Sequence, residues 1–143
     1  MITDQYVKYI VIKTMSGAPS ELIPGIISLL PVKNRGAAFS ILTGKQAGLI
    51  ILSILLIVLL IVWLLIGKRS GGSAIVRVGA WLIIGGGIGN LCDRIRYGYV
   101  IDFFNLEFIH FAVFNMADVY IVSGAVLVLA DLLSTQKDQR TDT

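Results

Sequence analysis

The feature that most constrains this chain is an apolar run of 19 residues, from Gly48 to Ile66, that contains no charged side chain. At 1.5 Å per residue, a helix of this length reaches about 28 Å, close to the hydrocarbon thickness of a bilayer. Of the 143 residues, 56% are hydrophobic and 15% are charged, whereas about one-quarter are charged in an ordinary soluble domain. The sequence therefore predicts an integral membrane protein, with a single domain over residues 1–143.

Two further spans are expected after this run. The short segment Gly67–Gly72 is basic and glycine-rich, which predicts a cytoplasmic turn. The second span is expected from about Ile75 to Cys92, and the third from about Phe111 to Ala130. The connecting segments Ser16–Gln46 and Asp93–His110 would then lie together on the outer side. Since prolines interrupt the apolar residues of the first one, we expect short strands or an amphipathic piece at the membrane surface.

Two aspartates occupy positions where a carboxylate is costly. Asp102 lies in the apolar, aromatic run Tyr99–Phe104, and Asp118 lies inside the start of the third span. Burial of a carboxylate costs free energy unless the group has a partner. Asp118 alone could be structural, paired with Lys8 or Arg94. Two acids that converge at one membrane face instead favour a shared site, because neighbouring carboxylates hold one proton between them and can activate water. They predict aspartic peptidase chemistry.

The inventory of side chains excludes several other chemistries. Cys92 and His110 are the only cysteine and the only histidine, which excludes Ser/His, Cys/His and zinc-peptidase sites. We expect neither a metal site nor a cofactor, and we expect these two residues to fill the core or the interface. The basic residues are scattered and do not form a stripe, so nucleic acid is not an expected partner.

A glycine-rich segment lies in the second span. It lacks the GxGxxG spacing of a nucleotide site. Gly85 and Gly89 form a GxxxG pair, which predicts close helix packing. Gly86, Asn90 and Arg94 step by four along the same helix, so that one face is small deep in the membrane and polar at its outer end. A substrate backbone could lie on that face.

Five sequence blocks occur in order: Asp4-Gln5 with Lys8; Asn34-Arg35-Gly36-Ala37-Ala38-Phe39; Gly86 with Gly89-Asn90-Leu91-Cys92-Asp93-Arg94; Val100-Ile101-Asp102-Phe103; and Phe114-Asn115-Met116-Ala117-Asp118. Together they resemble the bacterial lipoprotein signal peptidases, also called signal peptidase II, over nearly the whole chain. The resemblance implies an all-α membrane protein, a four-helix transmembrane bundle with a small extracytoplasmic β-element. It also implies residence in the bacterial cytoplasmic membrane, with the active site toward the outer side.

The same resemblance implies the activity and the partners. The substrate would be a prolipoprotein whose cysteine bears a diacylglyceryl group, and cleavage would occur just before that cysteine. Membrane lipids would surround the enzyme, and the cyclic peptide globomycin would block it. The substrate helix would enter laterally from lipid, and its diacylglyceryl chains would fix the depth of the scissile bond.

Carried onto this sequence, the resemblance assigns the catalytic pair to Asp102 and Asp118. Asp4 and Lys8 are expected to be architectural. The positions around the substrate are Asn34, Gly36, Phe39, Gly86, Asn90, Arg94 and Asn115. Asn34 and Asn90 are expected to hydrogen-bond the signal-peptide backbone, and Arg94 to meet carbonyl or lipid oxygens. Asn115 precedes Asp118 by three residues and is expected to be an orienting donor. For Phe39, substrate packing and a structural role both remain open.

The alternative is a small proton-coupled membrane transporter that uses Asp102 and Asp118, because acids within a membrane also mark proton pathways. Transporter sites usually lie near the membrane midplane, whereas both acids here lie toward one end of the spans. A membrane scaffold without activity is a third possibility.

The first helix is expected to be short. Only Met1, Ile2 and Thr3 precede Asp4, whereas the resembled family usually places most of a span before this position. A helix over Ile2–Met15 would reach about 21 Å, less than the hydrocarbon core of about 30 Å. We therefore expect it to begin inside the bundle near mid-membrane. Asp4 and Lys8 lie one turn apart and can pair, either at the surface or inside the bundle.

Overall fold

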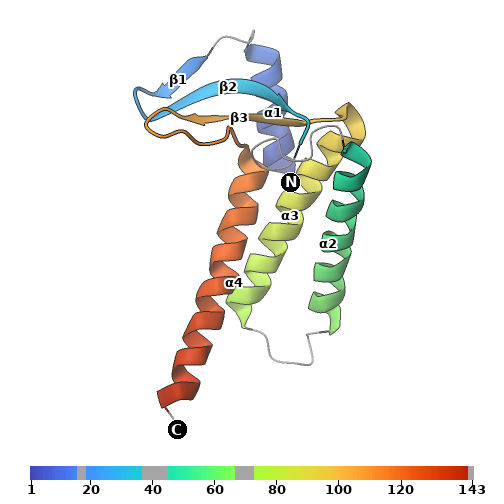
Figure 1. Ribbon diagram of the computed structural model, residues 1–143, viewed down its shortest axis with the longest axis vertical. Helices are drawn as coiled ribbons and strands as arrows, with labels where there is room; N and C mark the ends of the chain where they lie inside the picture. Colours follow the sequence, from blue (N-terminus) through green and yellow to red (C-terminus); the bar gives the residue numbers. More distant parts are fainter. Residues whose placement is uncertain (16–18, 37–44, 67–72, 142–143) are drawn as a thin grey trace.

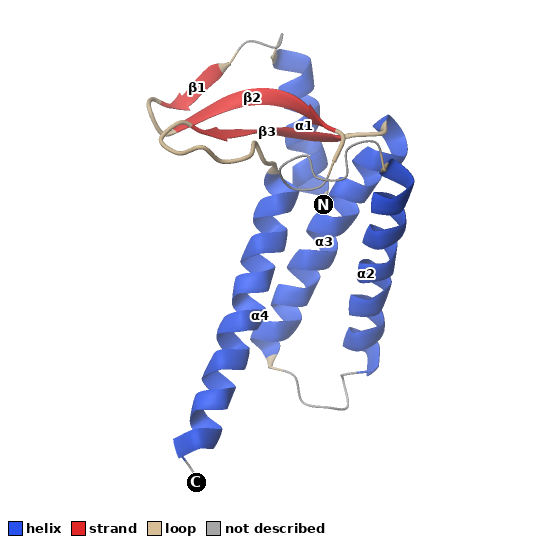
Figure 2. Cartoon of the chain, in the orientation of Figure 1, coloured by secondary structure: helices blue, strands red, loops and turns tan. Residues whose placement is uncertain are grey.

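The computed structural model describes residues 1–15, 19–36, 45–66 and 73–141, and for 135–141 it describes the backbone alone. Helices α2, α3 and α4 run lengthwise beside one another, and a small sheet lies across one end of them, next to the shorter α1 (Figure 1; Figure 2). The predicted four helices and small sheet are confirmed. The elements are, in order, α1 (Ile2–Thr14), β1 (Ser20–Ile23), β2 (Ile27–Asn34), α2 (Gln46–Ile66), α3 (Ala74–Tyr97), β3 (Val100–Leu106) and α4 (Met116–Thr141).

Three of these helices are long and apolar enough to cross a membrane: Gln46–Ile66, Ala74–Tyr97 and the Met116–Ser134 part of α4. The central one, α3, packs against both α2 and α4. A small apolar core between α2 and α3 contains Leu64 and Ile84. Most of the other large apolar side chains on these helices point outward, as is expected where lipid replaces water.

The boundaries of two spans differ from the prediction. The helix α3 does not end at Cys92 but continues to Tyr97, where Gly98, with a φ of 74°, donates its N–H to the Arg94 carbonyl and ends the helix. This left-handed conformation favours glycine and reverses the chain into β3. The third span begins at Met116 and not at Phe111, because Phe114 forms an isolated antiparallel bridge with Phe104 and is therefore extended.

The strands form an antiparallel sheet in the order β1-β2-β3. Gly25, with a φ of 71°, lies in the turn between β1 and β2. The segment Ser16–Gln46 thus contains short strands, as predicted, but Asp93–His110 is more than a connection, because it contributes the end of α3 and the whole of β3. Asn34 pairs with Val100 and Val32 with Asp102, so β2 lies beside the strand that carries the first candidate acid.

Close packing of α3 on α4 depends on small residues. A Cβ at Gly86 would meet the Ala117 carbonyl oxygen and would lie 2.8 Å from Ile121 Cγ1. A Cβ at Gly89 would lie 2.8 Å from an Asp4 carboxylate oxygen, whereas the nearest atom to one at Gly85 would be 3.9 Å away. The expected pair of Gly85 and Gly89 is therefore wrong in one member, because Gly85 faces away from this contact.

The first helix begins beside the middle of α3, since the Met1 nitrogen is the atom that lies 3.9 Å from a Cβ built on Gly85. It contacts α3, α4 and β3. Asp4 is 0% exposed and Lys8 is 2% exposed. The pair therefore lies inside the bundle, which decides between the two locations that the sequence left open.

Candidate active site

The two candidate acids come from different elements that meet where the sheet lies across the end of the helices. Asp102 lies on β3, and Asp118 lies in the first turn of α4. The N–H groups of Phe103 and Phe104 donate to the Phe114 carbonyl at 3.0 and 2.8 Å, which ties β3 to the segment that leads into α4. The chain reversal at Gly98 and this bridge together bring both acids to one end of the bundle.

Asn115 caps α4 and orients Asp118. Its side-chain oxygen accepts the Asp118 N–H at 3.0 Å, and its own N–H donates to Asp118 Oδ2 at 3.1 Å. This reciprocal pair resembles a capping box, in which residues three apart satisfy each other's backbone N–H groups. The Asp118 carboxylate also lies near the positive end of the helix dipole. Two hydrogen bonds thus join Asn115 to Asp118, one through the Asn115 side-chain oxygen as acceptor and one through its backbone N–H as donor.

Asp102 is 2% exposed and accepts two side-chain hydrogen bonds. Asn34 Nδ2 donates to Oδ2 at 2.9 Å, and Asn115 Nδ2 donates to Oδ1 at 2.6 Å. Burial raises the pKa of Asp102 from 3.8 to about 6; the hydrogen bond from Asn34 opposes this rise and the charge of Asp118 adds to it. Asp102 can therefore hold a proton at mildly acidic pH.

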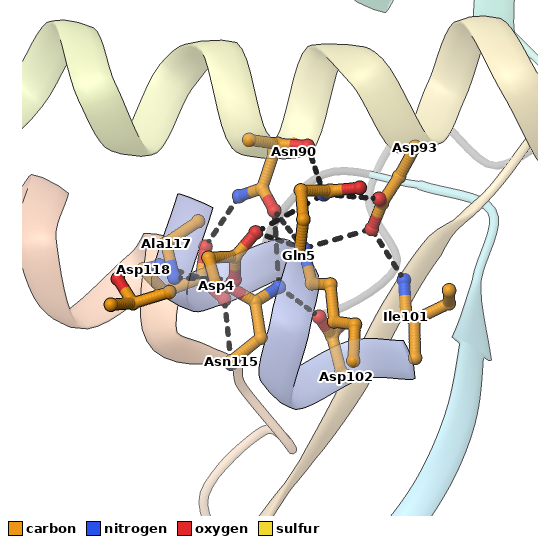
Figure 3. A network of polar contacts seen from close by, with 12 residues as sticks. Asp4, Gln5, Asn90, Asp93, Ile101, Asp102, Asn115, Ala117 and Asp118 are labelled. Atoms are coloured by element: carbon orange, nitrogen blue, oxygen red, sulfur yellow. Dashed lines mark hydrogen bonds and ion pairs between the residues drawn. The ribbon is translucent and has the colours of Figure 1, made fainter. Parts of the chain in front are cut away.

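Asn90 completes the link between the acids. Its Nδ2 donates to Asp118 Oδ1 at 2.8 Å, and its Oδ1 accepts from Asn115 Nδ2 at 3.1 Å. Since Asn115 also donates to Asp102, two asparagines join the carboxylates in a continuous chain of hydrogen bonds (Figure 3). Fixed donors of this kind hold carboxylates in place without solvent.

Arg94 closes one side of the site. Its Nη2 donates to the Gly36 carbonyl at 3.0 Å, and its Nη1 lies 3.4 Å from the Asn90 carbonyl. Gly36 in turn donates its N–H to Asn34 Oδ1 at 2.9 Å. The buried Arg94 Nε has no hydrogen-bond partner within the described part of the chain. The guanidinium therefore ties the segment after β2 to α3 and keeps an unused N–H donor beside the acids.

A cavity of about 500 Å³ lies over the two acids. Much of its wall is apolar and belongs to α4 and the segment before it, including Phe111, Val119 and Val122. Val122 is itself exposed, so the cavity opens at the surface of the bundle along α4, which is long and apolar enough to cross a membrane. Its polar lining is Asn34, Asn90, Arg94, Asp102 and Asp118. Such a site suits an apolar substrate with a few polar groups at one end.

A charged cluster lies behind the cavity. Lys8 Nζ is 3.0 Å from Asp4 Oδ2 and 2.8 Å from Asp93 Oδ2. Gln5 Nε2 donates to Asp93 Oδ1 at 2.8 Å and to the Gly89 carbonyl at 3.2 Å. Among the described residues, Asp118 forms an ion pair with neither Lys8 nor Arg94; its carboxylate instead accepts hydrogen bonds from Asn90 and Asn115.

The remaining predicted residues differ in their positions relative to the cavity. Gly86 packs against α4 and does not line the cavity, so the expected substrate surface at this position is replaced by a helix contact. Asn115 is fully buried behind the acids. Phe39 lies outside the described residues. Cys92 and His110 are exposed, and so they do not fill the core.

Sequence reasoning gave no role to Asp93 or Gln5. Both lie inside the quoted sequence blocks, and Asp93 is a charge at the end of an apolar helix, which is itself a functional signal. Its partner Lys8 could not be identified, since the two are far apart in sequence. Among the described residues, no group of three or more His, Cys, Asp or Glu side chains is arranged to hold a metal ion.

The chain is similar in sequence to proteins of known family. The family model described as "Signal peptidase (SPase) II" matches residues 1–134. The lipoprotein signal peptidase of Streptococcus pneumoniae is 41% identical over 134 residues, which are 93% of this chain and 86% of the relative. That of Halothermothrix orenii is 39% identical over 138 residues, which are 96% of this chain and 92% of the relative.

Two solved structures share the fold. A bacterial membrane enzyme solved by the in meso method at 2.3 Å resolution has a TM-score of 0.89 and 31% identity, and the match covers 96% of this chain and 84% of that one. A second, solved at 1.9 Å resolution by the same method, has a TM-score of 0.82 and 32% identity over 92% of this chain and 86% of that one.

Proposed function

Because the chain belongs to the signal peptidase II family, we propose that it is a membrane aspartic endopeptidase with Asp102 and Asp118 as its catalytic pair. Its substrates would be diacylglyceryl-modified prolipoproteins, from which it removes the signal peptide by cleavage before the lipidated cysteine. The observation that carries this proposal is the convergence of two carboxylates, from β3 and α4, on one largely apolar cavity.

The arrangement supports different roles for the two acids, with one as proton donor and the other as proton acceptor. Asp102, whose pKa is raised to about 6 mainly by burial, is suited to hold the shared proton. Asp118 receives the Asn90 amide and the Asn115 N–H on its two oxygens, and these bonds fix its carboxylate for proton acceptance. In the reaction, Asp118 takes a proton from water while the water oxygen attacks the scissile carbonyl carbon. Asp102 donates its proton to the carbonyl oxygen. As the C–N bond breaks, Asp118 passes the proton it took from water to the leaving amine, and one hydroxyl of the diol intermediate returns a proton to Asp102.

The shape of the cavity supports lateral entry of the substrate. Val119 and Val122 place one wall on the lipid-facing side of α4, so a signal helix can arrive from the bilayer without crossing water. Diacylglyceryl chains that stay among the membrane lipids would then hold the scissile bond at the depth of the acids. Positioning of this kind contributes much of the rate of an enzyme. Globomycin, as a cyclic peptide, would occupy the same cavity.

The sequence supports an orientation with the site on the outer side of the bacterial cytoplasmic membrane. The helix α2 ends and α3 begins at the end of the bundle opposite the sheet (Figure 1). The intervening sequence carries Lys68 and Arg69, and cytoplasmic loops are enriched in such residues. The acids lie near the other end of the helices, beside the sheet.

The test is cleavage of a lipidated prolipoprotein peptide by the purified protein in detergent, with the product identified by mass spectrometry. We expect cleavage before the lipidated cysteine and none of the unlipidated peptide. Asp102→Asn and Asp118→Asn should each lower kcat by about 10² or more, because acid-base help is typically worth that much. The control is Asp131→Asn, which lies on α4 but contacts Ser73 at the far end of the bundle.

Cleavage by either active-site variant within tenfold of wild type would contradict the catalytic pair. The transporter alternative makes the opposite prediction for the same proteins. Proton flux into vesicles that depends on Asp102 and Asp118, together with no cleavage of the lipidated peptide, would replace the peptidase by a transporter.

A further inference from the structure

We propose that Lys8 is a positioning residue of the active site, through which α1 sets the placement of both candidate acids; this rests on the proposed function. Lys8 lies outside the cavity lining and cannot touch the substrate there. Its ammonium nevertheless contacts three side chains of a buried network that reaches Asp102 by one route and Asp118 by two routes.

The ammonium of Lys8 is fully satisfied. It lies 3.0 Å from Asp4 Oδ2, 2.8 Å from Asp93 Oδ2 and 3.2 Å from Asn90 Oδ1. An ammonium has three N–H donors and no acceptor, so these three partners use its whole capacity. Because the side chain is 2% exposed, water does not compete for these bonds. The position of the charge is therefore fixed by α1 and α3 together.

Each of the two carboxylates that pair with Lys8 also accepts a backbone N–H from the residue that precedes a candidate acid. Asp4 Oδ1 accepts the N–H of Ala117, the residue before Asp118, at 3.0 Å. Asp93 Oδ2 accepts the N–H of Ile101, the residue before Asp102, at 3.1 Å. The ion cluster thus links the start of α4 to the start of β3. Movement of Lys8 would shift both backbones that present the acids.

The third route runs through the side-chain amide of Asn90. Lys8 and Asn115 both donate to Asn90 Oδ1, at 3.2 and 3.1 Å, and so occupy the two lone pairs of that oxygen. A flipped amide would place two N–H groups against two donors. The Asn90 nitrogen must therefore point the other way, where it donates to Asp118 Oδ1 at 2.8 Å. Lys8 therefore helps to orient the Asn90 amide so that its N–H group, and not its oxygen, faces Asp118.

The charge of Lys8 also acts on the titration of the pair. The charged groups around it are Asp4 on α1, Asp93 on α3, Asp102 on β3 and Asp118 on α4, while Arg94 is the other cation beside the acids. The positive charge of Lys8 lowers the pKa of Asp102 against the larger effect of burial. Removal of the charge should therefore move the titration of Asp102 to higher pH.

The experiment uses two variants of the full chain. Lys8→Met removes the cation and leaves two buried carboxylates unpaired, which can prevent folding. Lys8→Met combined with Asp4→Asn keeps the net charge of the cluster, and the new amide oxygen can still accept the Ala117 N–H. The matched control is Lys13→Met, an exposed lysine on the same helix that contacts only the Tyr9 hydroxyl and ring among its described partners.

For the double variant we expect a folded protein whose kcat on the lipidated peptide is lower by about 10-fold or more, with KM within about threefold, because misplacement of a catalytic group by about 1 Å can cost about 10²-fold. The acid limb of its pH–rate profile should move to higher pH, because the positive charge of Lys8 that lowers the pKa of Asp102 is removed. Lys13→Met should match wild type.

An infrared titration provides a readout that needs no activity. The carboxyl band of Asp102, identified by its loss in Asp102→Asn, should titrate at higher pH in the Lys8 variants than in wild type. Failure of the wild-type protein to cleave the lipidated peptide would count against the proposed function, whereas the infrared shift would still decide the role of Lys8.

Three results would overturn the role of Lys8. A double variant with wild-type kcat, pH profile and carboxyl titration would make Lys8 an architectural residue only. A raised KM with unchanged kcat would assign it to substrate binding. Failure of both Lys8 variants to fold would show that the lysine serves the fold and not the placement of the acids.

Discussion

A single methyl group added at Gly86 should distinguish helix packing from substrate contact. The Cβ of Gly86→Ala would meet the Ala117 carbonyl oxygen and lie 2.8 Å from Ile121 Cγ1. Carbon atoms in good contact lie about 3.5 to 4.0 Å apart, so α3 and α4 must separate by about 0.7 Å or more. The side chain of Ile121 can rotate, but the carbonyl of Ala117 belongs to the helix backbone and cannot yield alone.

The size of the destabilisation by Gly86→Ala follows from comparison with the same change at the neighbouring Gly85. Gly85→Ala makes the same chemical change on the same helix, but its nearest new contact is at 3.9 Å. Both variants share the gain in helix propensity, about 1 kcal/mol at most in water. Their difference is the cost of overpacking, about 1 to 3 kcal/mol. For a chain of this size, Gly86→Ala should then melt roughly 3 to 10 °C below Gly85→Ala.

The Gly86→Ala change should lower kcat as well as the melting temperature. Asn90 lies one turn beyond Gly86, and its bond to Asp118 crosses the same helix contact at 2.8 Å. A separation of about 0.7 Å would lengthen this bond to about 3.5 Å, the limit of a useful hydrogen bond. Since misplacement by about 1 Å can cost 10²-fold, kcat should drop by roughly 10-fold or more.

The assay is thermal unfolding in detergent without substrate, followed by cleavage kinetics on the lipidated peptide. Equal melting temperatures for Gly86→Ala and Gly85→Ala would refute the packing argument. Unchanged melting together with a raised KM would instead return Gly86 to the substrate surface that the sequence suggested.

Three further outcomes are expected. Folding raises the pKa of Asp102 from 3.8 to about 6, so the folded state binds this proton more tightly than the unfolded state does. The resulting contribution to the free energy of unfolding is complete below pH 3.8 and is lost as pH rises through 6. The loss amounts to up to about 3 kcal/mol. The melting temperature of Asp102→Asn minus that of wild type should therefore increase between pH 4 and pH 7, and a difference independent of pH would contradict the raised pKa. Arg94→Lys should lower kcat/KM, because an ammonium cannot replace the planar guanidinium that donates to the Gly36 carbonyl. The control is Arg96→Lys, the same change at an exposed residue in the same helix turn. Equal kinetics for the two variants would show that Arg94 only anchors the helix end. Chelators should leave cleavage unchanged, since the chain has one His and one Cys, and a loss reversed by added metal would contradict the mechanism.

The sequence alone determined the membrane character of the protein and the three segments that are apolar enough to span a bilayer. An uncharged run such as Gly48–Ile66 has only one favourable environment, and its length matches a bilayer. Asp102 and Asp118 were also recognisable as candidate acids from their apolar surroundings in the chain, because burial of a carboxylate is costly. These conclusions depend on properties of short stretches of chain, which hydropathy and spacing report directly.

The boundaries of the helices required the tertiary structure. Residues before Met116 are apolar enough for a span, yet Phe114 is held extended by its bridge to Phe104 on β3. A local pattern cannot show that a strand competes for the same backbone groups. For the same reason, the sequence did not reveal that α3 continues to Tyr97 before the chain turns at Gly98 into β3.

The partners of the buried charges also depended on the fold. Sequence spacing offered Asp4 as the neighbour of Lys8, and the structure adds Asp93 from α3 and Asn90 beside it. Likewise, the small face of α3 was visible in the sequence, but only the structure showed that Gly86 meets α4. Hydrophobic burial and backbone spacing are set by residues near one another in sequence, whereas a hydrogen bond or an ion pair depends on where distant segments are brought into contact.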